Sequence, residues 1–386
     1  MYPPRLAIGS LKFMSKSTSD TPTHQHNQPV PSSIGRPTSS PDQEVPEEAH
    51  DLSPLILVTG AGGFLGSEIA RQGLARGLRV RGLARGHYPE MQAIGVEMLR
   101  GDVANADVVR EAARDCIAIF HVAAKAGAWG PTADYERANV QGTREVIEAC
   151  RLAQVPKLIF TSSPSVVHAG GDIEGADESL PYPDHYLADY PRTKAEAEQL
   201  ALAANGPDLS TVALRPHLIW GPGDRHLIPR LVDRARRGRL RHLAPEKLVD
   251  SVYIEDAARA HWDAFDQLRV GADCAGKAYF ITQGEPWPIA ELIEGILDAL
   301  NESCPRRTIS PKLAMMIGRS LEWIYRLLKI HSEPVMTRFI AEQLSTAHWF
   351  SIEAARRDLG YQPQRTIREA LIALREAESA GRRVSD

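Results

Sequence analysis

The stretch LILVTGAGGFLG, residues 55–66, decides the fold. Its first five residues form a short apolar run that predicts a buried strand, and the following FLGSEIARQGLARG predicts a helix. Between them, Gly60, Gly63 and Gly66 fit the spacing G-x-x-G-x-x-G. Glycines let the backbone approach a pyrophosphate, whose charge is favoured at a helix N-terminus. A glycine-rich turn alone is weak evidence, but this turn between a strand and a helix favours dinucleotide binding.

The same alternation of strand and helix continues along the chain. Short apolar runs recur at RVRGL, VEMLRGD, CIAIFHVAA, KLIFTSS and TVALRP, with helical stretches between them. This rhythm predicts βαβ units and an α/β fold with a doubly wound parallel sheet, the Rossmann architecture. It loosens after Pro216, where we expect a smaller, mostly helical C-terminal substrate lobe. We assign 54–222 and 246–283 to the nucleotide-binding domain, and 223–245 and 284–386 to the substrate lobe.

Composition excludes several classes of protein. The chain has 386 residues, a formal net charge of −4 and no dense basic stretch, so we expect no nucleic-acid partner. Its four cysteines are far apart, which indicates reduced thiols and a cytoplasmic protein rather than a disulfide framework. Residues 1–53 are rich in proline, serine and polar side chains, which predicts a disordered tail. We also expect no membrane-spanning segment, because no later stretch is apolar and uncharged for long enough.

The end of the second predicted strand selects the nucleotide. A carboxylate there, about 20 residues after the glycine turn, holds the ribose 2′-hydroxyl of NAD. This chain reads VRGLARG, with no acid, and offers Arg81 and Arg85 instead. A guanidinium suits a 2′-phosphate, so we expect NADP(H) rather than NAD(H), with Arg85 as the better contact. The alternative is that both arginines are solvated surface charges.

The segment LADYPRTKAEAEQL, residues 187–200, places Tyr190 and Lys194 one helical turn apart. Proline is tolerated in the first turn of a helix, and the residues that follow are strong helix formers. A positive charge beside a phenol favours phenolate and lowers the phenol's pKa, as acid–base catalysis near neutral pH requires. Tyr325 and Lys329 repeat the spacing, but the polar residues at helical intervals around them indicate the border of an amphipathic helix.

Five motifs in a fixed order resemble those of a known superfamily. They are TGAGGFLG at 59–66, GDV at 101–103, HVAA at 121–124, FTSS at 160–163 and YPRTK at 190–194. From about residue 54 onward the chain resembles the extended short-chain dehydrogenases/reductases. The resemblance implies a catalytic set of Ser163, Tyr190 and Lys194, with Ser162 as the fallback for the serine. With Arg85 added, the expected cofactor contacts are Gly60, Gly62, Gly63, Phe64, Leu65, Gly66, Arg85, Asp102, Val103, Ala123, Ala124, Tyr190, Lys194 and Pro216.

The second half of the chain narrows the resemblance. LRPHLIWGPGD, DSVYIEDAARAHWDA and RRDLGYQPQRTIREAL resemble the 3β-hydroxysteroid dehydrogenase branch. Within it, KAGAWGP and SVVHAGGDIEG are most similar to bacterial reductases of 2-alkyl-3-oxoalkanoates in olefin biosynthesis. That resemblance implies NADPH-dependent reduction of a 3-oxo group on a large lipid-like acid. The alternatives are a 3β-hydroxysteroid or sterol-4α-carboxylate 3-dehydrogenase, a nucleotide-sugar epimerase or dehydratase, and a non-catalytic NADP sensor on the same fold.

Several side chains are candidates for the substrate site. They are Lys125, His168, His217 and Arg230 to meet a carboxylate, and Trp129 and Trp220 to line a lipid-sized pocket. Each has a plain alternative, because an isolated histidine or tryptophan more often packs or lies at the surface. His168 and His217 have no neighbours at metal-ligand spacing, so we expect no metal site.

The apolar residues within 312–330 leave two interpretations open. The helix predicted there either packs against the substrate lobe or meets a membrane surface or a partner protein. A peripheral membrane contact would suit an enzyme of insoluble chains. A homodimer is also left open.

Overall fold

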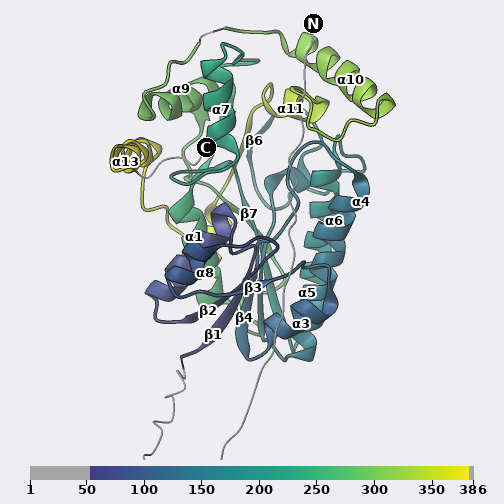
Figure 1. Ribbon diagram of the computed structural model, residues 1–386, viewed down its shortest axis with the longest axis vertical. Coiled ribbons are helices and arrows are strands. Elements are labelled where there is room, and N and C mark those ends of the chain that lie inside the picture. The colour runs from purple at the N-terminus through teal and green to yellow at the C-terminus, as the bar shows by residue number, and fades with distance from the viewer. Residues whose placement is uncertain (1–52, 306, 382–386) are drawn as a thin grey trace, which may run out of the picture. The chain divides into compact units, whose positions relative to one another are not determined.

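The computed structural model describes residues 53–305 and 307–381, which form one compact unit (Figure 1). The tail expected over 1–53 lies outside these residues, apart from Ser53. A central sheet carries helices on both faces, and a helical region lies beyond the carboxyl ends of its strands (Figure 1). The structure therefore confirms the predicted Rossmann architecture with a mostly helical C-terminal region.

The central sheet has seven strands, all parallel, in the order β11-β7-β5-β4-β1-β2-β3. Their bounds are β1 Leu55–Thr59, β2 Arg79–Ala84, β3 Glu97–Arg100, β4 Cys116–His121, β5 Lys157–Thr161, β7 Ser210–Pro216 and β11 Ala278–Ile281. The chain moves outward from β1 to β3 and then returns to the other side of β1 with β4. Ligands of such sheets bind at this switch point, beyond the carboxyl ends of the strands.

Strand β1 explains why helices cover both faces. All five of its residues are buried, and alternate side chains point to opposite faces. Ile56 and Val58 pack in the cluster that holds α1 and α8, whereas Leu55 and Leu57 pack in the cluster that holds α3 and α5. The bounds of the flanking helices are α1 Phe64–Ala75, α2 Pro89–Ala93, α3 Ala106–Ala113, α4 Thr132–Tyr135, α5 Gly142–Leu152, α6 Asp189–Ala203 and α8 Ile254–Gln267. A π-helical turn, Glu136–Gln141, joins α4 to α5, and a 3₁₀ turn, Pro164–Val167, follows β5.

A second sheet and six helices build the region beyond the strand ends. The four-stranded sheet has the order β12-β9-β13-β6, and β8 pairs with β10 separately. The strand bounds are β6 Ile173–Ala176, β8 Ile219–Trp220, β9 Leu248–Val249, β10 Val252–Tyr253, β12 Trp287–Pro288 and β13 His348–Phe350. The helix bounds are α7 Leu227–Arg236, α9 Ile289–Ala299, α10 Pro311–Leu327, α11 Arg338–Gln343, α12 Glu353–Leu359 and α13 Ile367–Ser379. None of the helices that the structure describes is long and apolar enough to cross a membrane.

The two regions are interleaved along the chain. Strand β6, which lies inside the stretch assigned to the nucleotide-binding domain, pairs with β13 near the C-terminus. Helix α12 returns to pack on α8 and β11 of the central sheet. The domain boundaries given above stay a prediction.

Helix α10 does not pack in the way that the core-packing interpretation of its sequence predicts. The residues that it buries are Ala314, Gly318 and Glu322, and most of its large apolar side chains face solvent. Packing against the lobe through the apolar face is therefore wrong. Apolar periodicity located a helix here but not the side on which it docks.

Candidate active site

The turn between β1 and α1 is built for close approach of a ligand. Gly60 has φ +73°, and a Cβ there would lie 2.9 Å from the Ala123 nitrogen. At Gly66 an added Cβ would lie 2.2 Å from the Gly60 oxygen, so helix and turn pack without room for a side chain. No side chain caps the N-terminus of α1, which leaves its first N–H groups to bind an anion. These features fit a dinucleotide pyrophosphate.

A cavity of about 470 Å³ runs from this turn along the carboxyl ends of the strands. The predicted cofactor contacts that line it are Gly60, Gly63, Phe64, Leu65, Gly66, Arg85, Asp102, Val103, Ala123, Ala124, Tyr190, Lys194 and Pro216. Gly62 does not line it, because Gly62 packs beneath the ring of Tyr88, which would lie 2.3 Å from an added Cβ. Sequence reasoning did not identify Tyr88, which lines the cavity from the loop after β2.

Arg81, in β2, and Arg85, directly after it, have different environments. Arg81 forms an ion pair with Glu97 at 2.9 Å and donates to the main-chain oxygens of Ala112 and Arg114. Arg81 therefore has a structural role, because these contacts within the fold use its guanidinium. Arg85 is exposed at the end of the strand and lines the cavity on the same side as Asp102. Asp102 forms an ion pair with Arg137 at 3.0 Å.

The predicted catalytic residues converge at the carboxyl end of β5. Tyr190 lies in the first turn of α6, one residue after Asp189, where the helix begins. Lys194 follows one turn later, is 3% exposed, and donates from Nζ to the Thr161 oxygen at 2.6 Å. Ser163 leaves the end of β5 and hydrogen-bonds the Tyr190 side chain. The fold thus brings Ser163, Tyr190 and Lys194 to one place.

The pKa values at this site are governed by burial. Burial lowers the pKa of Lys194 to about 7, against the attraction of Glu198, which acts in the opposite direction. Burial also raises the pKa of Tyr190, and the hydrogen bond with Ser163 offsets only part of the rise. The expectation that Lys194 lowers the Tyr190 pKa is therefore not met in the protein alone. The reason is that burial of the Tyr190 phenol itself disfavours phenolate and is the largest influence on its pKa.

The two serine candidates can be distinguished. Ser163 Oγ lies 3.0 Å from Ser165 Oγ and faces both the nucleotide cavity and a second cavity beside it. Ser162 faces the nucleotide cavity alone, and its Oγ is buried without a hydrogen-bond partner in the part of the chain described. The geometry favours Ser163 as the side chain that meets a substrate oxygen.

Asn139 is a positioning residue that sequence reasoning missed. It lies in the π-helical turn, is buried, and accepts from the Lys125 nitrogen at 2.7 Å. Its amide donates to the Lys125 oxygen at 3.1 Å and to Thr193 Oγ1 at 2.9 Å. Thr193 precedes Lys194 on α6, so Asn139 fixes the loop after β4 to the catalytic helix.

The second cavity, of about 320 Å³, meets the first at Ser163 and Tyr190. It is largely apolar, and helices α7 and α11 and strand β13 form much of its wall. Its apolar lining comes from Leu218, Leu227, Leu231, Phe339, Ile340, Leu344 and Phe350. Three of the substrate candidates, His168, His217 and Arg230, also line it. The sequence did not single out Arg234, Gln343 or His348, which join them.

The other three substrate candidates line neither cavity. Trp220 is fully buried, and its indole N–H donates to Ser251 Oγ at 3.0 Å, so it is a core residue. Trp129 donates to the Ile330 oxygen at 3.1 Å and packs edge-on against Tyr325, next to α10. Lys125 forms an ion pair with Asp134 at 3.1 Å. These three assignments are corrected, because packing and local pairing use the side chains elsewhere. Tyr325 and Lys329 also line neither cavity.

Three histidines, His168, His217 and His348, line the second cavity. His217 donates from Nδ1 to Asp250 at 2.5 Å, and the His348 ring lies 4.9 Å from that of His217. Burial lowers the pKa of His348 to about 3 and also lowers that of His168. His168 Nε2, His348 Nδ1 and Gln343 Nε2 are buried without a hydrogen-bond partner among the described residues. A polar ligand group is therefore able to bind in this cavity.

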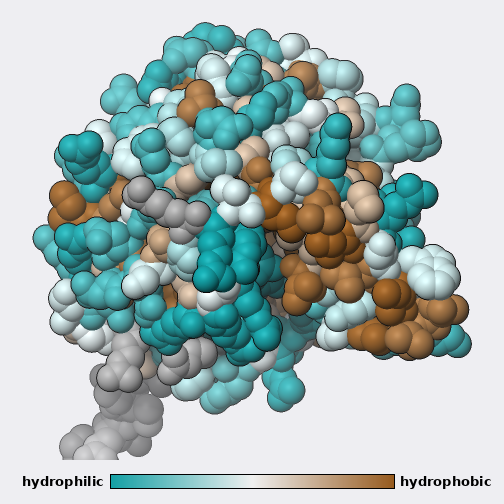
Figure 2. All heavy atoms as spheres, turned by 90° about the horizontal axis from the view of Figure 1, so that it is seen from above, coloured by the Kyte–Doolittle hydropathy of each residue, from teal (hydrophilic) through white to brown (hydrophobic). Residues whose placement is uncertain are grey.

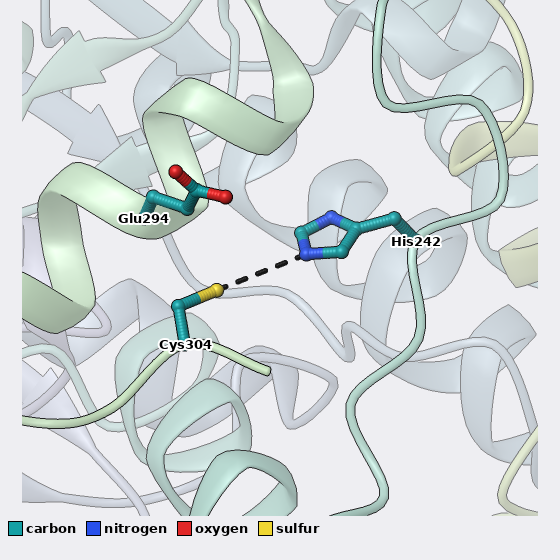
Figure 3. Close-up of side chains that lie close together, drawn as sticks. All are labelled: His242, Glu294 and Cys304. Atoms are coloured by element: carbon teal, nitrogen blue, oxygen red, sulfur yellow. Dashed lines mark hydrogen bonds between the residues drawn. The ribbon is translucent and has the colours of Figure 1, made fainter. Parts of the chain in front are cut away.

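A cluster of potential metal ligands lies outside both cavities. His242, Glu294 and Cys304 place their ligand atoms within 4.8 Å of one another, and Cys304 Sγ lies 3.8 Å from His242 Nε2 (Figure 3). They come from the loop after α7, from α9 and from the loop after α9. The expectation of no metal site considered the spacing of the cysteines and of His168 and His217 along the sequence, so it missed this grouping of residues distant in sequence. No catalytic or cavity-lining residue belongs to it.

The fold and the Ser–Tyr–Lys set define a class of protein: an oxidoreductase that uses a nicotinamide cofactor on hydroxyl or keto groups. The family model of the 3-beta hydroxysteroid dehydrogenase/isomerase family matches residues 57–311, and the chain belongs to this family.

Two sequence relatives agree with this membership. The 2-alkyl-3-oxoalkanoate reductase of Stenotrophomonas maltophilia is 50% identical over 329 residues, which cover 84% of this chain and 99% of that protein. The decarboxylating sterol-4-alpha-carboxylate 3-dehydrogenase of Mus musculus is 34% identical over 320 residues, which cover 81% and 88% of the two chains. Both relatives are named for reactions at an oxo or hydroxy group of a lipid-like carboxylic acid.

A solved structure confirms the fold. MoeE5 in complex with UDP-glucuronic acid and NAD superposes with a TM-score of 0.66 at 24% sequence identity. The match covers 84% of this chain and 99% of that chain. At this identity the likeness concerns architecture, and the substrate must be argued from the second cavity.

Proposed function

We propose that the chain reduces the 3-oxo group of a 2-alkyl-3-oxoalkanoate to a 3-hydroxy group with NADPH, in olefin biosynthesis. The observation that carries the proposal is the junction of the two cavities. Ser163 and Tyr190 line both the glycine-rich cavity and the apolar one. A carbonyl group at that junction reaches a hydroxyl donor while its alkyl chains lie among leucine, isoleucine and phenylalanine side chains.

The residues at the junction divide the chemistry. A bound reduced nicotinamide supplies hydride to the carbonyl carbon. Tyr190 donates its phenolic proton to the carbonyl oxygen as charge develops there, and water later restores the proton. Ser163 donates a hydrogen bond to the same oxygen and stabilises its charge. Lys194, held on the Thr161 oxygen, is the cation that we assign to easing loss of the tyrosine proton in the complex with cofactor, since the protein alone does not lower the Tyr190 pKa.

Arg234 is the residue that we assign to the substrate carboxylate. It lines the apolar cavity, and burial together with Arg230 lowers its pKa. Arg230 is already paired with Glu333 at 2.6 Å. Arg234 donates to the Val335 oxygen at 3.1 Å and forms no ion pair within the described chain. Glu333 and Asp233 attract this half-buried guanidinium without forming an ion pair with it, so its donors are suited to a carboxylate ligand.

The test uses the oxidative direction, because 3-oxo acids lose carbon dioxide in solution. Purified enzyme is given NADP⁺ with a 2-alkyl-3-hydroxy acid or with its methyl ester. Arg234→Met should raise KM for the acid about tenfold or more and leave the ester nearly unchanged, since a charged hydrogen bond is lost. Arg237→Met, at the C-terminal cap of the same helix but paired with Asp233 outside the cavity, is the matched control. Turnover of a 3β-hydroxysteroid or a UDP-sugar, with none of either acid or ester, would contradict the proposal.

NADP(H) is the cofactor form that we propose. Arg85 supports it, because it lines the nucleotide cavity at the end of β2, where VRGLARG has no acid. A cytoplasmic homodimer is our further expectation, and sedimentation of the purified enzyme at several concentrations tests the dimer.

The apolar cavity also weighs against the nucleotide-sugar alternative. A diphosphate would need several free cations, whereas Arg230 is paired and most of the lining is hydrocarbon. A sterol carboxylate also has an acid group, so the two candidate substrates must be distinguished by the shape of their hydrocarbon parts. Comparing a branched acyl substrate with a sterol carboxylate of equal concentration does this.

A further inference from the structure

Helix α10 presents large apolar side chains to solvent. Trp323 is 66% exposed and Met316 is 65% exposed, which is unusual for such residues on the surface of a water-soluble protein. The exposed apolar residues of α10 and the segment after it are Leu313, Met316, Ile317, Trp323, Ile324, Leu327, Leu328 and Val335. Apolar side chains gather over this side of the molecule (Figure 2). We call this set the α10 face.

The orientation of α10 is fixed by its opposite side. At Gly318 an added Cβ would lie 2.7 Å from the Thr337 carbonyl carbon, so the helix packs closely on the start of α11. Glu322 is buried and accepts from Arg338, at 2.7 Å from the main-chain nitrogen and 2.8 Å from Nε. A small residue and the ion pair of the buried Glu322 therefore anchor the helix. Rotation that buries the apolar side would break both contacts.

The exposed charges of helix α10 itself have one sign. Lys312, Arg319 and Arg326 are exposed on α10, and Lys329 follows it. The helix has one acid, Glu322, and this is the buried partner of Arg338. Apolar side chains among cations match the interface of an anionic bilayer, where tryptophan sits at headgroup level and lysine and arginine meet lipid phosphates. A second copy docked through the same face would bring like charges together.

The chain that carries the α10 face leads directly into a wall of the apolar cavity. The chain passes from α10 into α11, whose Phe339 and Ile340 line that cavity. On the other wall, Arg230 binds Glu333 and Arg234 binds the Val335 oxygen, both in the segment that joins α10 to α11. Surface and cavity are therefore built on the same short stretch of chain.

We propose that the α10 face seats the protein on the surface of an anionic lipid bilayer, next to the entrance of its apolar cavity. Delivery of substrate from the bilayer rests on the proposed function, but binding to the bilayer does not. Vesicle binding and turnover are accordingly measured separately. Wild-type protein that turns over substrate but does not bind vesicles contradicts this proposal, and wild-type protein that binds vesicles but lacks turnover contradicts the proposed function.

The experiment is sedimentation of the full chain with vesicles of phosphatidylcholine, alone or mixed with phosphatidylglycerol. Wild-type protein should sediment with the mixed vesicles, and Trp323→Ser with Leu327→Ser should reduce the bound fraction about tenfold or more. The control pair, Leu152→Ser with Ile372→Ser, removes two similarly exposed apolar side chains from α5 and α13. That control should bind as wild type does.

A charge variant separates lipid charge from apolar contact. Lys312→Glu with Arg319→Glu should lose binding to the mixed vesicles, and added salt should weaken wild-type binding in the same direction. All variants should keep wild-type turnover of a short, water-soluble hydroxy acid. Wild-type protein that stays in the supernatant overturns the proposal. A serine variant that sediments with vesicles as the wild type does also overturns the proposal. So does gel filtration in which the wild type is a dimer and the serine variant is a monomer, because the α10 face would then be a dimer interface.

Discussion

Lys194 donates from Nζ to the main-chain oxygen of Thr161 at 2.6 Å, which ties the catalytic helix to the end of the strand that leads to Ser163. The ammonium also lies 4.2 Å from the centre of the Phe160 ring. Strand β5 thus orients the lysine through its last two residues, Phe160 and Thr161. The cost of this arrangement is desolvation, which brings the pKa of Lys194 to about 7.

Tyr190→Phe should reduce kcat by about 10²- to 10⁴-fold, because it removes the proton donor and leaves the ring. Cofactor affinity, measured by the quenching of protein fluorescence, should change little. Ser163→Ala is a useful companion, since it removes the donor to the substrate oxygen and spares the phenol. Unaltered turnover by Tyr190→Phe would rule out the mechanism.

Lys194→Met should change how stability depends on pH. In the wild type the lysine pKa falls from its usual value of 10.5 to about 7 on folding. The unfolded chain therefore binds more protons between these values, and stability should rise as pH increases from about 7 to about 10. The methionine variant lacks that rise, so its advantage over wild type in thermal unfolding should be largest at or below pH 7. Parallel melting curves across the range would contradict the burial of a titrating amine.

Arg85→Ala should shift cofactor preference from NADPH toward NADH. Loss of a charged contact to a 2′-phosphate predicts a fall of about tenfold or more in kcat/KM for NADPH, with little change for NADH. The control is Arg81→Gln, which removes a cation held by Glu97 and two main-chain oxygens. It should lower the melting temperature and leave the cofactor ratio unchanged. An equal effect of both variants on the ratio would argue against Arg85.

Glu198→Ala should be strongly destabilising. Glu198 and Arg215 form a buried ion pair at 2.6 Å, with side chains 0% and 4% exposed. Removing one partner leaves an uncompensated buried charge, which costs about 3–5 kcal/mol. The double variant Glu198→Leu with Arg215→Met should recover much of the loss in urea unfolding. Because Glu198 holds the Lys194 pKa up, both variants should also move the pH profile of turnover to lower pH.

Sequence reasoning located the architecture and brought the predicted catalytic residues to one place in the fold, because local rules determine both; their catalytic role stays a prediction. Each of these patterns involves residues that are close together in the sequence: the glycine spacing, the apolar runs and the Tyr190–Lys194 spacing. Motif order then placed Ser163, Asp102 and Ala123 at the carboxyl ends of strands, where the structure puts them. The sequence could rank Arg85 above Arg81 but could not exclude Arg81. The ion-pair partner of Arg81, Glu97, comes from the neighbouring strand and is not marked by any local pattern.

The substrate cavity could not be predicted in the same way. Gln343 and His348 reach it from a part of the chain far from Ser163, and no local pattern marks them. Trp220 and Trp129 were expected at the cavity because of their size, but the same size makes them packing residues. The side on which α10 packs could not be predicted from the sequence either, because it depends on the contacts of Gly318 and Glu322 with the start of α11.

The small sheet formed by β6, β9, β12 and β13 has a consequence for exchanging specificity between relatives. Its strands come from four separate stretches of chain, and β13 bonds to both β6 and β9. The substrate region is therefore not a transplantable module. A chimaera that replaces the chain after one crossover point would mix strands from two parents in one sheet. Successful grafts must carry all four stretches together, whereas single side chains of α7 and α11 can be altered one at a time.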